Sequence, residues 1–123
     1  NEQPILRTDG SFKRDWVYVQ DVVEAYYLVG SELIKNPKNV STAYNFAGLD
    51  YLSVKDVYTS ICNAVNGEFV EPKYVIDSEL EIPDQYLDSS KIKNEIGFGA
   101  KYSLDESLKE TINWYKDNLQ FLK

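Results

Sequence analysis

The pair Arg14-Asp15 has residue types that could bind a phosphate group, and it stands directly before the aromatic and β-branched run at residues 16–19. A guanidinium presents a rigid fork of N–H donors that matches phosphate oxygens, so an arginine at the end of an element suits a diphosphate. The alternative is a surface ion pair between the two neighbours. Asp15 is expected to be structural in both cases, with its carboxylate bonded to the backbone of the following turn. Residue chemistry alone leaves both interpretations of Arg14 open.

Two further spacings resemble catalytic or nucleotide-binding motifs. Tyr51 and Lys55 have the Y-x-x-x-K spacing in which a lysine lowers the pKa of a tyrosine from the next turn of one helix. Ser53 is a helix N-cap candidate, which places Tyr51 outside the helix that contains Lys55. The G-x-G at Gly97 and Gly99 lacks the third glycine and a preceding strand, so it predicts a helix end. We therefore expect no catalytic residue in this chain and no cofactor bound by it.

The composition argues against several classes of function. The 123 residues carry a formal net charge of −7, and an acidic surface repels nucleic acids and anionic membranes. Histidine is absent and Cys62 is the one cysteine, which removes the commonest general base, an intrachain disulfide and a thiolate metal site. Cys62 lies in a helical apolar pattern and is predicted to be a small core residue. No apolar run approaches the roughly 20 residues of a membrane span, so we expect a cytoplasmic protein.

The elements that would position Arg14 alternate between strands and helices. Strands are predicted at 4–7, 14–19, 42–47 and 69–76, with a turn at Asp9-Gly10 and an interruption at Pro72. Apolar positions three and four residues apart predict helices at 21–36, 53–66, 89–96 and 103–119. This order indicates an α/β fold, or α+β for the chain alone, with a small mixed sheet and amphipathic helices in a single domain over residues 1–123.

Capping patterns and apolar stripes refine the helix predictions. Ser53 and Ser103 are each followed three residues later by an acid, the pattern of a capping box. The first helix is expected to turn an apolar stripe toward the core. That stripe comprises Val19, Val22, Val23, Tyr26, Tyr27, Leu33 and Ile34.

Residues 9–26 and 81–115 contain patterns of a known family. DGSFKRDWVYVQDVVEAY is similar to an R-D-aromatic-V-x-V-x-D segment, and EIPDQYLDSSKIKNEIGFGAKYSLDESLKETINWY is similar to a closing pattern of D-x-S-K, a helix, L-G-W/F, a basic residue and an amphipathic helix ending in W-Y. Both patterns belong to the later half of extended short-chain dehydrogenase/reductases that act on nucleotide sugars. Within that family, PILRTDGSFKRDWVYVQDVVEAYYL together with EIPDQYLDSSK most resembles the CDP-glucose 4,6-dehydratases.

The resemblance implies binding roles for individual residues. Arg14 corresponds to the arginine that reaches the diphosphate of the bound nucleotide sugar, and Glu81 to an acid that faces the nucleotide ribose. Many relatives place a second phosphate-binding arginine three residues before that acid, where this chain has Ser78. Arg7 is a candidate substitute, and the alternative is an exposed strand residue without a ligand. No metal is implied.

The resemblance also implies a partner outside these 123 residues. The glycine-rich loop that binds NAD and the catalytic tyrosine and lysine belong to an amino-terminal Rossmann half, so this chain is expected to be the carboxy-terminal, substrate-binding domain and not catalytic alone. The implied parent is a homo-oligomeric lyase that acts on CDP-glucose or a similar nucleotide sugar. It oxidises the sugar at C4 with NAD, removes water across C5 and C6 and returns the hydride to C6. The alternatives are an epimerase or reductase of the same superfamily and a stand-alone binding module.

Overall fold

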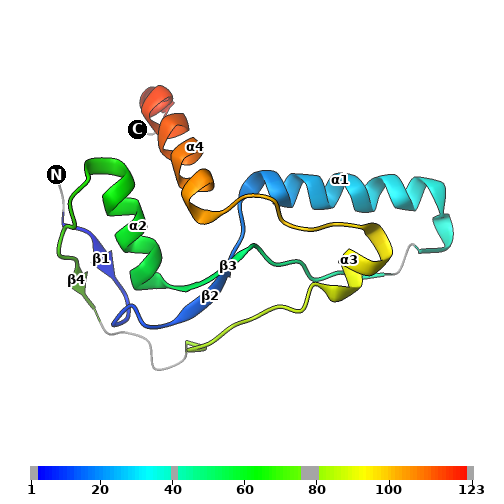
Figure 1. Cartoon of the computed structure of the whole chain (residues 1–123), viewed down its shortest axis with the longest axis horizontal. Helices are drawn as coiled ribbons and strands as arrows, with labels where there is room; N and C mark the ends of the chain where they lie inside the picture. Colours follow the sequence, from blue (N-terminus) through cyan, green and yellow to red (C-terminus); the bar gives the residue numbers. More distant parts are fainter. Residues whose placement is uncertain (1–2, 40–41, 76–80, 122–123) are drawn as a thin grey trace.

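A computed structural model of the chain describes residues 3–39, 42–75 and 81–121. Short strands and longer helices alternate along it, which confirms the predicted α/β class (Figure 1). β2 and β3 lie in the middle of the molecule, with α2 and α4 at one end and α1 and α3 at the other. The elements are β1 (Ile5–Leu6), β2 (Lys13–Trp16), α1 (Val19–Lys35), η1 (Pro37–Asn39), β3 (Asp50–Ser53), α2 (Val54–Asn66), β4 (Lys73–Tyr74), α3 (Ser90–Ile96), α4 (Leu104–Asp117) and η2 (Leu119–Phe121).

The strands form two separate pairs. β1 and β4 are parallel, whereas β2 and β3 are antiparallel. The turn at Asp9-Gly10 is confirmed, with Gly10 at φ 82°, but it does not fold β2 back onto β1. Instead the Gly10 carbonyl accepts a hydrogen bond from Lys55 N–H at 2.9 Å, and the Phe12 carbonyl accepts one from Val54 N–H at 3.0 Å. These bonds direct the chain toward the start of α2 and away from β1.

The predicted strand at 42–47 pairs with no strand among the described residues, and β2 pairs with β3, which follows that segment in the chain. Gly48 is the reason that the chain can reach β2 at this point. A Cβ atom on Gly48 would lie 1.7 Å from the Trp16 carbonyl oxygen and 3.1 Å from the Val17 Cα. Only a residue without a side chain permits so close an approach of two backbones.

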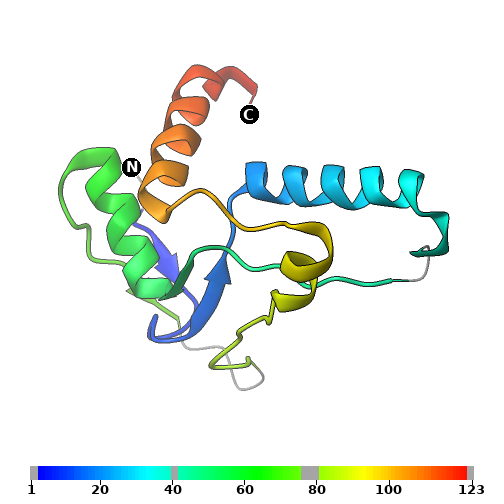
Figure 2. The same cartoon turned by 45° about the vertical axis from the view of Figure 1, so that its right-hand side comes forward.

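The predicted starts of α2 and α4 are confirmed by their caps, whereas α4 ends at Asp117, before the predicted end at residue 119. Ser53 Oγ accepts from Asp56 N–H at 3.1 Å, and Ser103 Oγ accepts from Glu106 N–H at 3.4 Å. In both helices the acid side chain accepts a hydrogen bond from the backbone N–H of the cap serine, which completes a capping box. Gly97 ends α3 in the left-handed conformation, as the sequence predicts. α2 and α4 then pack side by side (Figure 2).

A small apolar core lies between α1, α3 and the extended segment 42–47. Its buried members are Ala25, Ile92 and Phe98. The ring of half-buried Phe46 packs edge to face against the Phe98 ring, with 5.8 Å between the ring centres. Cys62 is buried in α2, which confirms its predicted place in the interior.

The predicted core stripe of α1 is wrong for most of its residues. Tyr27 is 72% exposed and Ile34 is 84% exposed, whereas the residues that α1 buries fully are Asp21 and Ala25. α1 is apolar on more than one face, and periodicity does not indicate which face other elements cover. The exposed apolar residues of α1 are Val19, Val23, Tyr26, Tyr27 and Ile34.

Candidate functional site

The strand that carries Arg14 has a neighbour on each edge. β3 pairs with one edge of β2. On the other edge, Lys13 N–H donates to the Pro83 carbonyl at 3.0 Å, and Gln85 N–H donates to the Lys13 carbonyl at 3.2 Å. These two bonds form a short parallel bridge between Lys13 and Asp84. The fold therefore brings the predicted diphosphate ligand, Arg14, next to the segment that contains the predicted ribose ligand.

The Arg14 side chain is half-buried, and the described residues occupy only part of its hydrogen-bonding capacity. Its Nη1 donates to the Lys13 carbonyl at 2.8 Å, and its Cζ lies 6.0 Å from the centre of the Phe12 ring. Among the described residues the one ion pair is Lys101–Glu24, so Arg14 and Asp15 do not form the alternative ion pair. Adjacent strand residues point to opposite faces, which explains why the two charges do not meet.

Asp15 makes a different contact from the predicted one. Its Oδ2 accepts a hydrogen bond from Leu87 N–H at 2.5 Å, across 72 positions of sequence. The expectation that it would bond the following turn is wrong, because the Asp15 side chain projects toward the neighbouring segment instead. A link over this separation leaves no local sequence signal.

Glu81 lies just before the bridge and is exposed. An extended chain covers at most about 3.6 Å per residue, so Glu81 is within about 11 Å of Asp84, the residue that pairs with Lys13. Glu81 thus belongs to the segment that lies along the outer edge of β2. Ser78, the position of the missing second arginine, is outside the described residues.

Arg7 belongs to a different part of the structure. It is exposed and follows β1, which pairs with β4 and not with β2. No hydrogen bond or ion pair between described residues connects Arg7 with Arg14 or Glu81. The fold thus brings Arg14 and the Glu81 segment together and leaves Arg7 in the other strand pair.

The opposite face of β2 contains an aromatic cluster that sequence reasoning missed. Lys13 Nζ lies 5.6 Å from the centre of the Tyr51 ring, and the Tyr51 and Tyr86 rings meet edge to face at 5.8 Å. Tyr51 is in β3 and Lys55 is in α2, so the structure confirms that the Y-x-x-x-K pair does not share a helix. Lys13 and Asp15 are two residues apart in a predicted strand and therefore lie on the same face, which is the sequence signal that separates Lys13 from Arg14.

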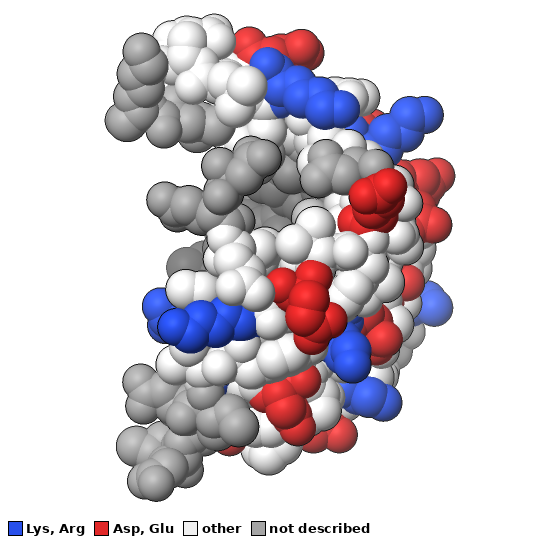
Figure 3. Space-filling model, turned by 90° about the vertical axis from the view of Figure 1, so that its left-hand side faces the viewer, with Lys and Arg blue, Asp and Glu red and all other residues white. Residues whose placement is uncertain are grey.

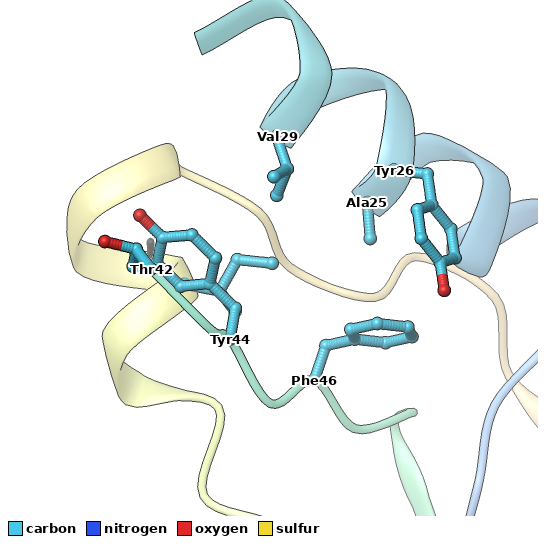
Figure 4. A pocket seen from close by; sticks show the side chains of 7 residues that line it. Ala25, Tyr26, Val29, Thr42, Tyr44 and Phe46 are labelled. Carbon is cyan, nitrogen blue, oxygen red and sulfur yellow. The ribbon is translucent and has the colours of Figure 1, made fainter. Parts of the chain in front are cut away.

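A hollow of about 170 Å³ lies between α1 and the segment 42–46 (Figure 4). Its walls are largely apolar, and Tyr44 OH donates to Glu95 Oε2 at 2.9 Å beside it. Desolvation and that hydrogen bond raise the pKa of Tyr44. The residues that line it are Ala25, Tyr26, Val29, Thr42, Tyr44, Phe46 and Ile92.

The described residues do not fit a dinucleotide. Glycines with positive φ are Gly10, Gly67 and Gly97; the first precedes a strand and the other two end helices. A dinucleotide-binding turn needs its glycines between a strand and the start of a helix.

Within the described ranges no three His, Cys, Asp or Glu side chains form a metal cluster, and no helix is long and apolar enough to cross a membrane. Acidic and basic side chains are interspersed on the face around α2 (Figure 3).

Comparisons with known proteins agree on one family. Residues 1–111 match the GDP-mannose 4,6 dehydratase family. The dTDP-glucose 4,6-dehydratase of Haemophilus influenzae is 32% identical over 89% of this chain and 34% of its own length. The structure of dTDP-glucose 4,6-dehydratase from Bacillus anthracis, solved with NAD, superposes with a TM-score of 0.81 at 25% identity, over 98% of this chain and 36% of that one.

An epimerase is similar to the same extent. UDP-glucose 4-epimerase from Thermotoga maritima, solved with UDP-glucose, superposes with a TM-score of 0.78 at 25% identity, over 96% of this chain and 36% of that one. The chain spans between 16% and 34% of the length of its curated relatives. The shared region is thus a part of each of these enzymes.

Proposed function

Because the chain belongs to the GDP-mannose 4,6 dehydratase family, a family of extended short-chain dehydrogenase/reductases that act on nucleotide sugars, we propose that it is the substrate-binding domain of an NAD-dependent nucleotide-sugar 4,6-dehydratase. The parent enzyme would be a lyase that yields a 4-keto-6-deoxy sugar nucleotide. A cytoplasmic location, expected because the sequence has no long apolar run, and a homo-oligomeric assembly, implied by the resemblance, are part of this proposal.

The observation that carries the proposal is the placement of Arg14. Its guanidinium has five N–H donors, and the described structure occupies one of them with a backbone carbonyl. The remaining donors suit the diphosphate, and Glu81 on the adjacent segment suits the ribose hydroxyls. Arg7 is proposed as an additional diphosphate contact from the resemblance, without support from its position beside β4.

The proposed partner of this domain is an amino-terminal Rossmann half that binds NAD. Two neighbouring features of the described chain support such a partner. Several apolar residues of α1, such as Tyr27 and Ile34, are exposed, and the segment 42–47 runs alongside α1 with no described strand paired to it. A partner that adds a strand and an apolar surface would satisfy the backbone groups of the segment and cover the helix face.

The nucleotide and the sugar are proposed on narrower grounds. The resemblance of the two sequence segments favours CDP-glucose. Relatives with known substrates include enzymes named for dTDP-glucose and for UDP-glucose, so the base is decided by measurement and not by similarity. A second candidate function is a nucleotide-sugar epimerase, which the similarity to UDP-glucose 4-epimerase supports.

The test is an assay of the full-length protein in which this domain follows its Rossmann half. Purified enzyme is incubated separately with CDP-glucose, dTDP-glucose, UDP-glucose and GDP-mannose, and the products are analysed by mass spectrometry. A dehydratase product lacks one water, whereas an epimerase product has an unchanged mass and a new sugar configuration. No turnover of any of these nucleotide sugars, in a protein that binds NAD, would contradict both candidates.

Arg14→Ala in that enzyme tests the site itself. Removal of one or two charge-assisted hydrogen bonds, at roughly 1.5–3 kcal/mol each, should weaken nucleotide-sugar binding by about ten- to a few hundredfold. Arg14→Lys should restore only part of the affinity, because lysine keeps the charge without the planar fork. Lys35→Ala, at the last turn of α1, is the matched control and should bind like wild type. Wild-type affinity in Arg14→Ala would rule out the diphosphate contact.

A further inference from the structure

We propose that Asp15 is a positioning residue for nucleotide-sugar binding. Its carboxylate fixes the segment that carries Glu81 against the strand that carries Arg14, so that both side chains meet one nucleoside diphosphate. This inference rests on the function proposed above and adds a residue to its binding site.

The hydrogen bonds on the outer edge of β2 show how Asp15 acts. Lys13 uses both its N–H and its carbonyl to hold Pro83 and Gln85. In a regular parallel ladder the next donor, Leu87 N–H, would meet the backbone carbonyl of Asp15. Here the Asp15 carboxylate accepts that N–H at 2.5 Å. The Asp15 side chain thus takes the place that the Asp15 backbone carbonyl would have in the next hydrogen bond of the ladder.

Arg14 lies between the two attachment points that Lys13 and Asp15 provide. The segment 85–89 has no helix or strand of its own in the described structure, so its position depends on these backbone contacts with β2 and on the packing of Tyr86 against Tyr51 of β3. Without the Asp15 bond, the segment would be held to β2 only at Lys13 and could pivot there. The Glu81 side chain would then no longer keep a fixed distance from the Arg14 guanidinium.

Charge alone predicts the opposite effect from positioning. Asp15 is negative, and removal of a negative charge near an anion site strengthens anion binding. Loss of affinity on removal of Asp15 would therefore reflect lost geometry. Asparagine separates the two effects, because its amide oxygen can accept Leu87 N–H without a charge.

The experiment measures binding of CDP, dTDP, UDP and GDP to the full-length protein by calorimetry, and continues with the diphosphate that binds most tightly. Asp15→Ala should weaken its binding about tenfold, whereas Asp15→Asn should stay within about threefold of wild type. NAD content and kcat should change less than about threefold in both variants. Hydrogen exchange of the Leu87 amide should be at least about tenfold faster in Asp15→Ala and near wild type in Asp15→Asn.

A double-mutant cycle with Arg14→Ala separates this inference from the proposed function. If Asp15 acts through the geometry around Arg14, adding Asp15→Ala to the Arg14→Ala variant should weaken nucleoside-diphosphate binding by less than about threefold. Additive losses, or wild-type binding by Asp15→Ala beside weak binding by Arg14→Ala, would overturn the positioning role alone. Wild-type binding by Arg14→Ala would overturn the proposed diphosphate site.

If Asp15→Ala does not fold, Leu87→Pro, which lacks the N–H, is compared with Leu87→Ala, which keeps it. Equal affinities of those two would overturn the positioning role.

Discussion

At the scale of single residues, Gly48 determines whether β3 can reach the strand that carries Arg14. A Cβ atom there would lie 1.7 Å from the Trp16 carbonyl oxygen and 2.7 Å from the Trp16 carbonyl carbon. These are backbone atoms, so they cannot move aside as the end of a flexible side chain would. We expect Gly48→Ala to lower the free energy of unfolding by about 2–4 kcal/mol, as overpacking and backbone strain do in protein interiors. Chemical denaturation measures this change.

Gly30→Ala is the matched control for this substitution. Gly30 lies within α1, and nothing comes within 4 Å of a Cβ atom built on it. Alanine should therefore raise the free energy of unfolding by about 0.5–1 kcal/mol, because glycine loses more backbone entropy in a helix. Equal effects of the two substitutions would show that Gly48 does not hold the close approach between β2 and β3.

At the scale of elements, the two capping boxes should contribute comparably to α2 and α4. Each serine oxygen accepts the backbone N–H of the third helical residue, and each acid bonds the backbone N–H of its serine. Ser53→Ala and Ser103→Ala should each lower the free energy of unfolding by about 1 kcal/mol at neutral pH. Ser60→Ala, in the interior of α2, should be neutral or slightly stabilising, since alanine has the higher helix propensity.

The same caps predict a dependence of stability on pH. The hydrogen bonds from Ser53 hold the pKa of Asp56 below its ordinary value of 3.8, and those from Ser103 hold the pKa of Glu106 below 4.5. A lowered pKa in the folded state stabilises the protein fully above the ordinary value, and this stabilisation is lost as the pH falls through the lowered pKa. Thermal unfolding from pH 7 to below pH 3.8 should show the cost of Ser53→Ala shrinking. A cost that grows toward acid pH would contradict the capping geometry.

At the scale of the whole molecule, we predict that the 123-residue chain alone does not bind NAD. Its described glycines of positive φ lie before a strand or after helices, where they form no dinucleotide cradle. Calorimetric titration with NAD should give no saturable heat, while the full-length protein serves as the positive control. A dissociation constant in the low micromolar range for the isolated chain would place the cofactor site in this domain after all.

The sequence by itself determined the features that depend on neighbours along the chain. The capping boxes at Ser53 and Ser103 and the helix end at Gly97 involve contacts over three or four residues, so residue types at fixed spacing were sufficient to predict them. The family was also visible in the sequence, because its two patterns are continuous segments. Arg14 was identified as a candidate ligand for the same reason.

Tertiary structure alone decided the features that depend on residues far apart in the chain. The hydrogen-bond partner of Asp15 lies 72 positions away in the sequence. β1 pairs with β4 and not with β2. The need for glycine at position 48 follows only from the Trp16 carbonyl beside it. Apolar periodicity marked α1 as amphipathic but could not indicate which of its faces the other elements cover, and Tyr27 and Ile34 are exposed. The physical reason is that a local pattern records what a residue can bury or bond, whereas chain topology determines which partner it meets.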